Sequence, residues 1–194
     1  AIMPPIFQTS TYVQTAPGEH KGYDYSRADN PTRETYEKAL AGLEHAKYGL
    51  AFSSGLAAEQ AVAQLLSPGD RVLVSDDVYG GTGRLFRRLY AKYGITFEFV
   101  DLTDTQAVAK TLSQGPALSL IWVESPSNPL MKIIDIKAMA DLAKIHKARL
   151  VVDNTFASPV FQNPLSLGAD IVVHSTTKYI GGHSDVIGGA LMMN

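Results

Sequence analysis

The chain contains 194 residues, of which 45% are hydrophobic and 19% are charged, and its formal net charge is −2. This composition is typical of a folded globular domain and provides neither a basic surface for nucleic acid nor a cationic segment for a membrane. The absence of cysteine excludes disulfides and thiolate metal sites, and no apolar run reaches the roughly 20 residues that a membrane span needs. We therefore expect the partner to be a small molecule.

The two ends of the chain lead to expectations about its compartment and its completeness. The first five residues lack the charged start, apolar core and cleavage site of a signal peptide, so we expect a cytoplasmic protein. An initiator methionine is absent, and the chain stops at Asn194 directly after an apolar, strand-like stretch. We expect a fragment of a longer polypeptide.

The first 30 residues have no sustained hydrophobic period and contain many Pro, Thr, Ser and Tyr residues, which predicts an extended N-terminal arm over residues 1–30. Asn30 and Pro31 then predict the start of a helix, because asparagine is a good N-cap and proline loses nothing at the first helical position. The residues expected to form the buried stripe of this helix are Tyr36, Leu40 and Leu43.

Short apolar runs then alternate with helical patterns as far as the end of the chain. The runs predicted as strands are residues 50–53, 71–75, 96–100, 118–123, 150–153 and 171–174. Apolar residues recur at helical spacing in two groups, namely Ala58, Ala61, Val62, Leu65 and Leu66, and Ile136, Met139, Ala140 and Ala143. Several strands are apolar at every position, which is typical of strands covered on both faces. The pattern predicts one three-layer α/β/α domain with a mostly parallel sheet over residues 31–194.

Ligands of such sheets bind beyond the carboxyl ends of the strands, so the polar residues that follow each strand are the candidates for chemistry. Lys178 follows the last predicted strand and precedes two glycines rather than other charges. A lysine that is partly removed from water loses its proton readily, which Schiff-base formation with a carbonyl requires. A solvated surface lysine is the alternative, and the neighbours of Lys178 decide between the two.

A phosphate-binding cup is predicted from two segments. Ser175 and Thr177 place two hydroxyl donors beside Lys178. Gly55 and Leu56 lie where a strand gives way to a helix, so unpaired N–H groups and the positive end of the helix dipole would face an anion. Serines and glycines also fill turns for conformational reasons alone, so only the combination favours an anion site.

Three further residues fit chemistry on an aromatic cofactor such as pyridoxal 5'-phosphate (PLP). Asp153 ends a predicted central strand, where its carboxylate would keep a pyridine nitrogen protonated or, alternatively, cap the following turn. Asn128, between two prolines, would donate to the ring oxygen or simply shape its turn. Tyr79 would stack on the ring and shuttle protons, or pack at the start of a helix.

Other site types have weaker support. The run from Gly81 to Gly83 resembles the start of a dinucleotide fingerprint, but Phe86 stands at the third glycine position. His174, His183 and Asp185 match no usual zinc spacing, so no metal site is expected. A serine-hydrolase G-x-S-x-G segment is also absent from the sequence.

Six ordered segments together carry a resemblance to a known family. They are Tyr25-Ser26-Arg27 with Asn30-Pro31-Thr32, AFSSGLA at 51–57, DVYGGT at 77–82, ESPSNP at 124–129, VDNTF at 152–156 and residues 174–185. The chain resembles the cystathionine γ-lyase, cystathionine γ-synthase and methionine γ-lyase family of Cys/Met metabolism. These are PLP-dependent enzymes of the aspartate-aminotransferase fold type I.

The resemblance implies roles for the candidate residues. Lys178 would carry PLP covalently and move protons in catalysis with Tyr79, Asp153 would pair with the ring nitrogen, and Asn128 would contact the ring oxygen. The phosphate would be bound by Gly55, Leu56, Ser175 and Thr177. Family members are homotetramers of active dimers, so Tyr25 and Arg27 would reach the phosphate of the neighbouring subunit. The arginine that holds the substrate carboxylate is expected in a smaller C-terminal domain that is absent from this chain.

Within the family the sequence favours a lyase. Residues 18–23 and 46–52 are more similar to the lyases, whereas residues 124–130 are more similar to the synthases. The expected activity is cystathionine γ-lyase, which releases cysteine, 2-oxobutanoate and ammonia, with cystathionine γ-synthase and methionine γ-lyase as alternatives. A PLP-binding or oligomerisation module without catalysis is the alternative outside enzymes.

Overall fold

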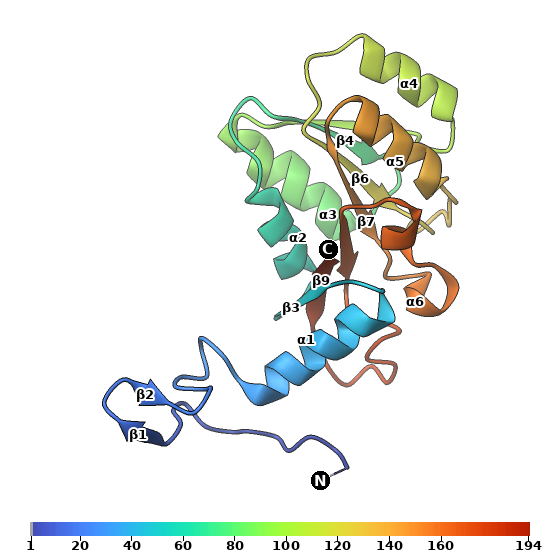
Figure 1. Ribbon diagram of the computed structural model, residues 1–194. Coiled ribbons are helices and arrows are strands. Elements are labelled where there is room, and N and C mark those ends of the chain that lie inside the picture. The colour runs from blue at the N-terminus through green and yellow to red at the C-terminus, as the bar shows by residue number, and fades with distance from the viewer. Residues whose placement is uncertain (1) are drawn as a thin grey trace.

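A seven-stranded sheet forms the centre of the computed structural model, which describes residues 2–194 (Figure 1). Its strand order is β3-β9-β8-β7-β6-β4-β5. The bounds are Tyr48–Phe52 for β3, Arg71–Ser75 for β4, Thr96–Val100 for β5, Leu120–Glu124 for β6, Arg149–Asp153 for β7, Ile171–His174 for β8 and Gly189–Met193 for β9. Strands β5, β4, β6, β7 and β8 pair in parallel, whereas β9 runs antiparallel to both β8 and β3. The predicted mostly parallel α/β sheet is confirmed.

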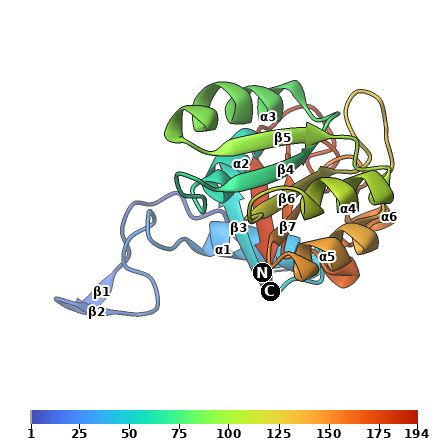
Figure 2. The same ribbon diagram turned by 90° about the horizontal axis from the view of Figure 1, so that it is seen from above.

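Helices cover both faces of the sheet. They are α1 (Pro31–Leu43), α2 (Gly55–Ala63), α3 (Gly80–Arg84), α4 (Thr105–Ser113), α5 (Ile136–Ile145) and α6 (Ser158–Phe161). Helix α3 continues into a π-helical turn at Leu85–Leu89 and a 3-10 turn at Tyr90–Tyr93, and a second 3-10 turn spans Pro164–Leu167. Helices α1, α4 and α5 pack on one face, and α2 and α3 with its continuation pack on the other (Figure 2). None of the helices in residues 2–194 has the length and hydropathy of a membrane span.

The central strands supply both cores at once, because successive side chains of a strand point to opposite faces. In β6, Ile121 and Val123 pack towards α4 and α5, whereas Trp122 packs towards α2 and α3. In β7, Val152 packs towards α4 and α5, and Val151 packs towards α2 and α3. All five side chains are fully buried. The strands that are apolar at every position are therefore explained by burial on both sides.

Helix α1 begins as predicted, but its buried face is different. The Asn30 side chain accepts hydrogen bonds from the backbone N–H groups of Thr32 and Arg33, which confirms the N-cap. Leu40 is buried, whereas Tyr36 and Leu43, expected in the same stripe, are 39% and 53% exposed. The reason is geometric: α1 lies over β3 and β9 at the edge of the sheet, so only a narrow stripe meets the core.

The segment before α1 extends away from the sheet and contains a short hairpin that the sequence did not predict (Figure 1). Its strands are β1 (Gln14–Ala16) and β2 (Glu19–His20), which pair antiparallel with an irregular register. The hairpin is solvent-exposed over most of its residues. Because it buries little apolar surface, no hydrophobic period marks it in the sequence.

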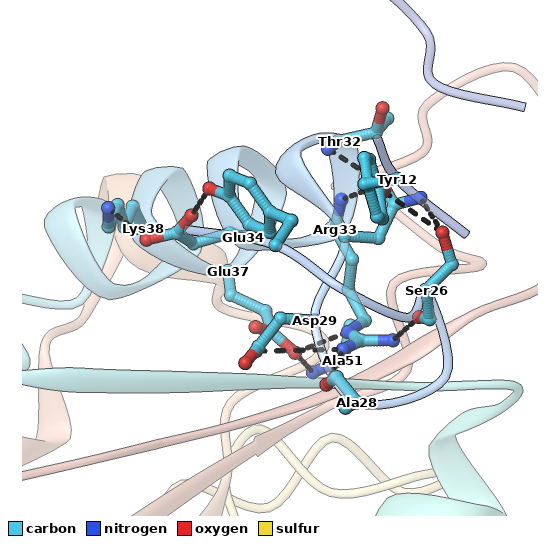
Figure 3. A network of polar contacts seen from close by, with 12 residues as sticks. Tyr12, Ser26, Ala28, Asp29, Thr32, Arg33, Glu34, Glu37, Lys38 and Ala51 are labelled. Carbon is cyan, nitrogen blue, oxygen red and sulfur yellow. Dashed lines mark hydrogen bonds and ion pairs between the residues drawn. The ribbon is translucent and has the colours of Figure 1, made fainter. Parts of the chain in front are cut away.

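Arg33 joins this segment to α1, and Glu37 continues the network to the edge strand β3 (Figure 3). The Arg33 guanidinium donates to the carbonyl oxygens of Ser26, at 3.1 Å, and of Ala28. Its Nε lies 3.8 Å from the carboxylate of Glu37, which in turn accepts the N–H of Ala51 at 2.9 Å. The path of the chain immediately before α1 is therefore tied to the sheet.

The packing of α5 leads to a stability prediction. Met139 is fully buried between α5 and the sheet, whereas Ile145 on the same helix is 72% exposed. Met139→Ala should lower the free energy of unfolding by about 2–5 kcal/mol, because it leaves a cavity in a close-packed core. Ile145→Ala is the matched control and should change it by less than about 0.5 kcal/mol. Denaturant unfolding measures both, and equal effects would contradict the assigned core.

Candidate active site

A cavity of about 460 Å³ opens at the carboxyl ends of the central strands. This volume lies in the range of pockets that bind small molecules and cofactors. The lining residues are Ser54, Gly55, Leu56, Glu59, Tyr79, Glu124, Pro126, Asn128, Asp153, Thr155, Phe156, Ser175, Thr177, Lys178 and Ile187. All of the predicted site residues outside the N-terminal segment are among them, so the fold gathers six separate segments of sequence into one cavity.

Strand register aligns the floor of this cavity. Glu124 at the end of β6 is the Cα partner of Asp153 at the end of β7. Asp153 in turn pairs with Val173 of β8, so His174 and the turn that carries Lys178 follow directly. Parallel strands that end together place the residues after them along one edge.

The N-terminus of α2 lies against Ser175. The Ser54 side chain caps the helix by accepting the N–H of Ala57 at 3.1 Å. A Cβ atom added to Gly55 would lie 2.7 Å from Cβ of Ser175, so only glycine permits this approach. The first backbone N–H groups of α2 and the Ser175 hydroxyl therefore lie side by side at the cavity wall, an arrangement that suits an anion such as phosphate.

Two threonines hold the loops around the cavity in place. The Thr177 hydroxyl donates to the carbonyl oxygen of Gly188 and accepts its N–H, at 3.2 and 3.1 Å. Thr155, which the sequence prediction missed, donates its N–H to Asp153 and accepts the N–H of Ser175 through its hydroxyl, both at 2.9 Å. The sequence feature that could have identified Thr155 is its position two residues after Asp153, at the carboxyl end of a predicted strand. The two bonds join the ends of β7 and β8.

Lys178 lies in the turn that follows β8. Its N–H donates to the carbonyl oxygen of Ser175 at 3.1 Å, and its own carbonyl accepts the N–H of Gly182 at 2.8 Å. The side chain lines the cavity but is exposed, so the expected partial removal from water is not found in this chain.

Tyr79 lines the cavity, and its ring packs closely against Gly81. A Cβ atom at Gly81 would lie 2.3 Å from Cε1 of Tyr79, so glycine makes room for the aromatic ring. The N–H of Tyr79 donates to Oε2 of Glu124 at 2.8 Å. Gly81 and Gly83 lie inside α3 rather than in a loop before a helix, which removes the basis of the dinucleotide hypothesis.

Three buried carboxyl groups share the cavity, and two of them were not predicted from sequence. Glu59, Glu124 and Asp153 are 3%, 5% and 6% exposed. Burial, followed by the negative charge of Asp153, raises the pKa of Glu124 to about 9 and that of Glu59 to about 8. Burial also raises the pKa of Asp153, against the hydrogen bonds from Thr155 and the charge of His174. Glu59 lies inside helix α2, where nothing in the sequence indicates that its side chain faces the cavity.

The three buried carboxyl groups can be compared with the charges of PLP to decide whether the cavity suits this cofactor. Among the lining residues that the structure describes, Lys178 is the only cationic side chain. Buried carboxylates are stable when a positive group pairs with them. The protonated pyridine nitrogen of PLP provides such a group, and the N-terminus of α2 suits its phosphate. The residues present therefore fit the cofactor at both of its charged ends.

A buried polar network lies behind Asp153 and was not predicted. Glu44, at the end of α1, contacts Nε2 of His174 at 2.5 Å and accepts from the side chain of Asn154 at 2.7 Å. Gln162 extends the network to the carbonyl oxygen of Ser125 at 2.9 Å. Glu44, Asn154 and His174 are almost fully buried. The network joins α1 to the ends of β6, β7 and β8.

The remaining predicted residues lie elsewhere. His183 is exposed and its ring contacts the carbonyl oxygen of Gly181, and over residues 2–194 no three metal-binding side chains gather. Tyr25 and Arg27 lie in the N-terminal segment, outside the cavity, with the guanidinium 5.0 Å from the tyrosine ring. Tyr25 is partly exposed, and its predicted contact with a neighbouring subunit stays a prediction.

The raised pKa values predict how stability depends on pH in the cofactor-free protein. The ordinary pKa of a glutamate is 4.5, so above this pH the unfolded chain releases protons that folded Glu59 and Glu124 retain. Stability is therefore lost as the pH rises from about 5 to about 9. Glu124→Gln keeps an acceptor for the Tyr79 N–H and should recover roughly 5–10 °C of melting temperature at pH 8. An identical pH profile of melting temperature in both proteins would contradict the prediction.

The chain is similar to known proteins over its whole length. Residues 1–194 match the family model described as Cys/Met metabolism PLP-dependent enzyme. A probable cystathionine gamma-synthase of Herpetosiphon aurantiacus is 53% identical over 192 residues, covering 99% of this chain and 60% of that protein. A cystathionine beta-lyase of Coxiella burnetii is 50% identical over 194 residues, covering 100% of this chain and 50% of that protein.

Comparison with solved structures gives the same family. Cystathionine gamma-lyase from Lactobacillus plantarum, crystallised with L-serine, has a TM-score of 0.92 at 48% identity, covering 98% of this chain and 49% of that one. The chain spans about half the length of the curated relatives it matches. With two buried cores, a cavity at the carboxyl edge of its sheet and this level of identity, the chain belongs to the family of Cys/Met metabolism PLP-dependent enzymes.

Proposed function

We propose that the protein acts as a cystathionine γ-lyase with PLP as its cofactor, cleaving cystathionine to cysteine, 2-oxobutanoate and ammonia. The observation that carries the proposal is that Lys178 and Asp153 line one cavity, at the ends of neighbouring strands. An amine able to hold an aldehyde and a carboxylate able to hold a pyridinium are the two groups that PLP chemistry requires. Lys178 is exposed, but its side chain lines the same cavity as three buried carboxyls, which favours a role in binding over that of an ordinary surface lysine.

In this proposal a subset of the lining residues holds the cofactor. Asp153 would pair with the ring nitrogen, and the Tyr79 ring would stack on the pyridine. Asn128 donates to the ring oxygen. The phosphate would be held by Gly55, Leu56, Ser175 and Thr177, since the start of α2 and the turn after β8 meet at that wall. The Thr177 hydroxyl would exchange its bond to the Gly188 carbonyl for one to the phosphate.

The reaction then depends on proton movements by two side chains. When bound, PLP supplies a protonated ring that accepts the electrons left on the substrate α-carbon. The amine of Lys178 removes the α-proton and serves as the acid and base for the β-carbon. The Tyr79 hydroxyl lies at the same cavity and exchanges protons with this amine. Loss of the γ-substituent follows.

The organisation of the complete protein is part of the proposal. Residues 1–30 form an arm, and residues 31–194 form the cofactor-binding domain. The arm brings Tyr25 and Arg27 to the phosphate of a neighbouring subunit, in a cytoplasmic homotetramer built from active dimers. The tie between Arg33 and the backbone at Ser26 and Ala28 supports a defined path for the end of the arm where it meets α1.

Two other reactions are favoured by specific relatives. The Herpetosiphon relative is named as a probable cystathionine gamma-synthase, and the Coxiella relative as a cystathionine beta-lyase. A synthase of this type displaces the acyloxy group of an activated homoserine ester with the sulfur of cysteine, and a β-lyase cleaves the other carbon–sulfur bond of cystathionine. Methionine γ-lyase is the remaining alternative. A module without catalysis is less consistent with a cavity that contains both Lys178 and Asp153.

Product analysis with the full-length gene product separates these activities. Cystathionine should yield 2-oxobutanoate and cysteine in equal amounts, measured by chromatography of the ketoacids. Pyruvate and homocysteine would instead identify a β-lyase. Cystathionine formed from an activated homoserine ester and cysteine would identify the synthase. Absence of every product from a PLP-loaded preparation would favour the binding module.

The covalent role of Lys178 is tested separately. Borohydride treatment of the PLP-loaded protein should attach the cofactor mass to the peptide that contains Lys178. Lys178→Ala should lose this attachment and lower kcat by about 100-fold to 10,000-fold, because the proton-transferring amine is removed. Lys144→Ala, at the exposed end of α5, is the matched control and should behave as wild type. Equal cofactor attachment in the Lys178→Ala protein would contradict the assignment.

A further inference from the structure

Glu59 is a buried acid in the cavity wall for which the proposed reaction has no use. It lies on α2 one turn after Gly55 and is 3% exposed. Within the described part of the chain, neither its Oε2 atom nor the hydroxyl of Thr82 on α3 makes a hydrogen bond of ordinary geometry. The Thr82 hydroxyl is still close enough to lower the pKa of Glu59, an effect that burial and the charge of Asp153 outweigh. A buried carboxyl without a positive partner destabilises a fold, so the position of Glu59 in the cavity wall favours a cationic partner from outside this chain.

The groups around Glu59 are mainly acidic. Asp153 from β7 and Glu124 from β6 line the same cavity, and His174 from β8 lies behind Asp153. Tyr79 at the start of α3 and Lys178 in the turn after β8 complete the titratable lining. Lys178 is held by the cofactor in the proposed function and is then no longer a free cation. The remaining partner with a positive charge is the cofactor ring.

We propose that Glu59 is a second acid for the cofactor ring: beside Asp153 it stabilises the positive ring nitrogen, and it releases a proton when that charge enters the cavity. This role rests on the proposed cofactor site. The step breaks the O–H bond of the Glu59 carboxyl, and the proton passes to solvent through the open side of the cavity. No electrons are transferred, and no other reactant is needed.

The direction of the proton release follows from electrostatics. In the cofactor-free protein burial holds the pKa of Glu59 at about 8, so most of the population is protonated at pH 7. A cation a few ångströms away favours the charged carboxylate and draws this pKa down. Cofactor binding and deprotonation of Glu59 are therefore coupled, and by reciprocity PLP should bind more tightly as the pH rises from about 6 to about 8.

Calorimetry measures this coupling directly. PLP is titrated into the cofactor-free, full-length protein at pH 7 in two buffers of different ionisation enthalpy, which reports the protons released per cofactor. Wild type should release roughly 0.5–1 proton more than Glu59→Gln. The variant should also bind PLP about 10-fold more weakly at pH 8, because one negative charge beside the ring is lost. Asp141→Asn, which removes an exposed acid from α5, is the matched control and should match wild type.

Stability of the cofactor-free protein separates this role from a merely structural one. A structural Glu59 would lower the melting temperature when replaced, whereas an unpaired buried acid should raise it when replaced by Gln or Met. Glu59→Met removes the same proton with an apolar side chain of similar length, and it carries the same test if Glu59→Gln does not fold.

Three combinations of results distinguish the role of Glu59 from the proposed function. Equal proton release and equal PLP affinity in wild type and a folded Glu59 variant would overturn the role of Glu59 while leaving the proposed function intact. A wild-type protein that binds no PLP would overturn the proposed function and this role together. Tight PLP binding by wild type, with weaker binding at pH 8 and less proton release in the variant, supports both.

Discussion

The site depends on the register of three neighbouring parallel strands. Glu124 of β6 stands opposite Asp153 of β7, and the residue after the last pair of β7 and β8 is His174. This alignment brings three loops to one edge, where no strand side chains remain to fill the space. A shift of one residue in β7 would turn Asp153 to the other face and bury it in a core. The cavity is thus a consequence of sheet pairing.

The same edge concentrates polar groups that would destabilise an ordinary core. The Glu44 network behind the sheet is nearly satisfied, with partners in His174 and Asn154, although Oε2 of Glu44 remains unpaired. The carboxyls of Glu59 and Glu124 in front of it retain protons instead. A protein tolerates such groups when they serve binding, and then stability is regained on binding. The network around Glu44 holds the loops in place, and Glu59 and Glu124 line the cavity where the ligand would bind.

Close backbone approach explains why small residues accompany the chemical ones. Gly55 lets α2 reach Ser175, and Gly81 leaves room for the ring of Tyr79. Each glycine is adjacent to a residue with a proposed role, so the glycines shape the wall while others make the contacts. Helix α2 then contributes to the cavity twice, through its N-terminus and, one turn later, through Glu59.

The sequence by itself determined the fold class, most strand positions and the residues after each strand, including Lys178 and Asp153, because these depend on local hydrophobic periods and strand ends. It predicted neither the hairpin before α1 nor the outward position of Tyr36, since these depend on which surfaces find partners. Only the tertiary structure decided that Glu59 faces the cavity. A helix places a side chain by its rotation against the sheet, and that rotation is set by packing across residues far apart in the chain.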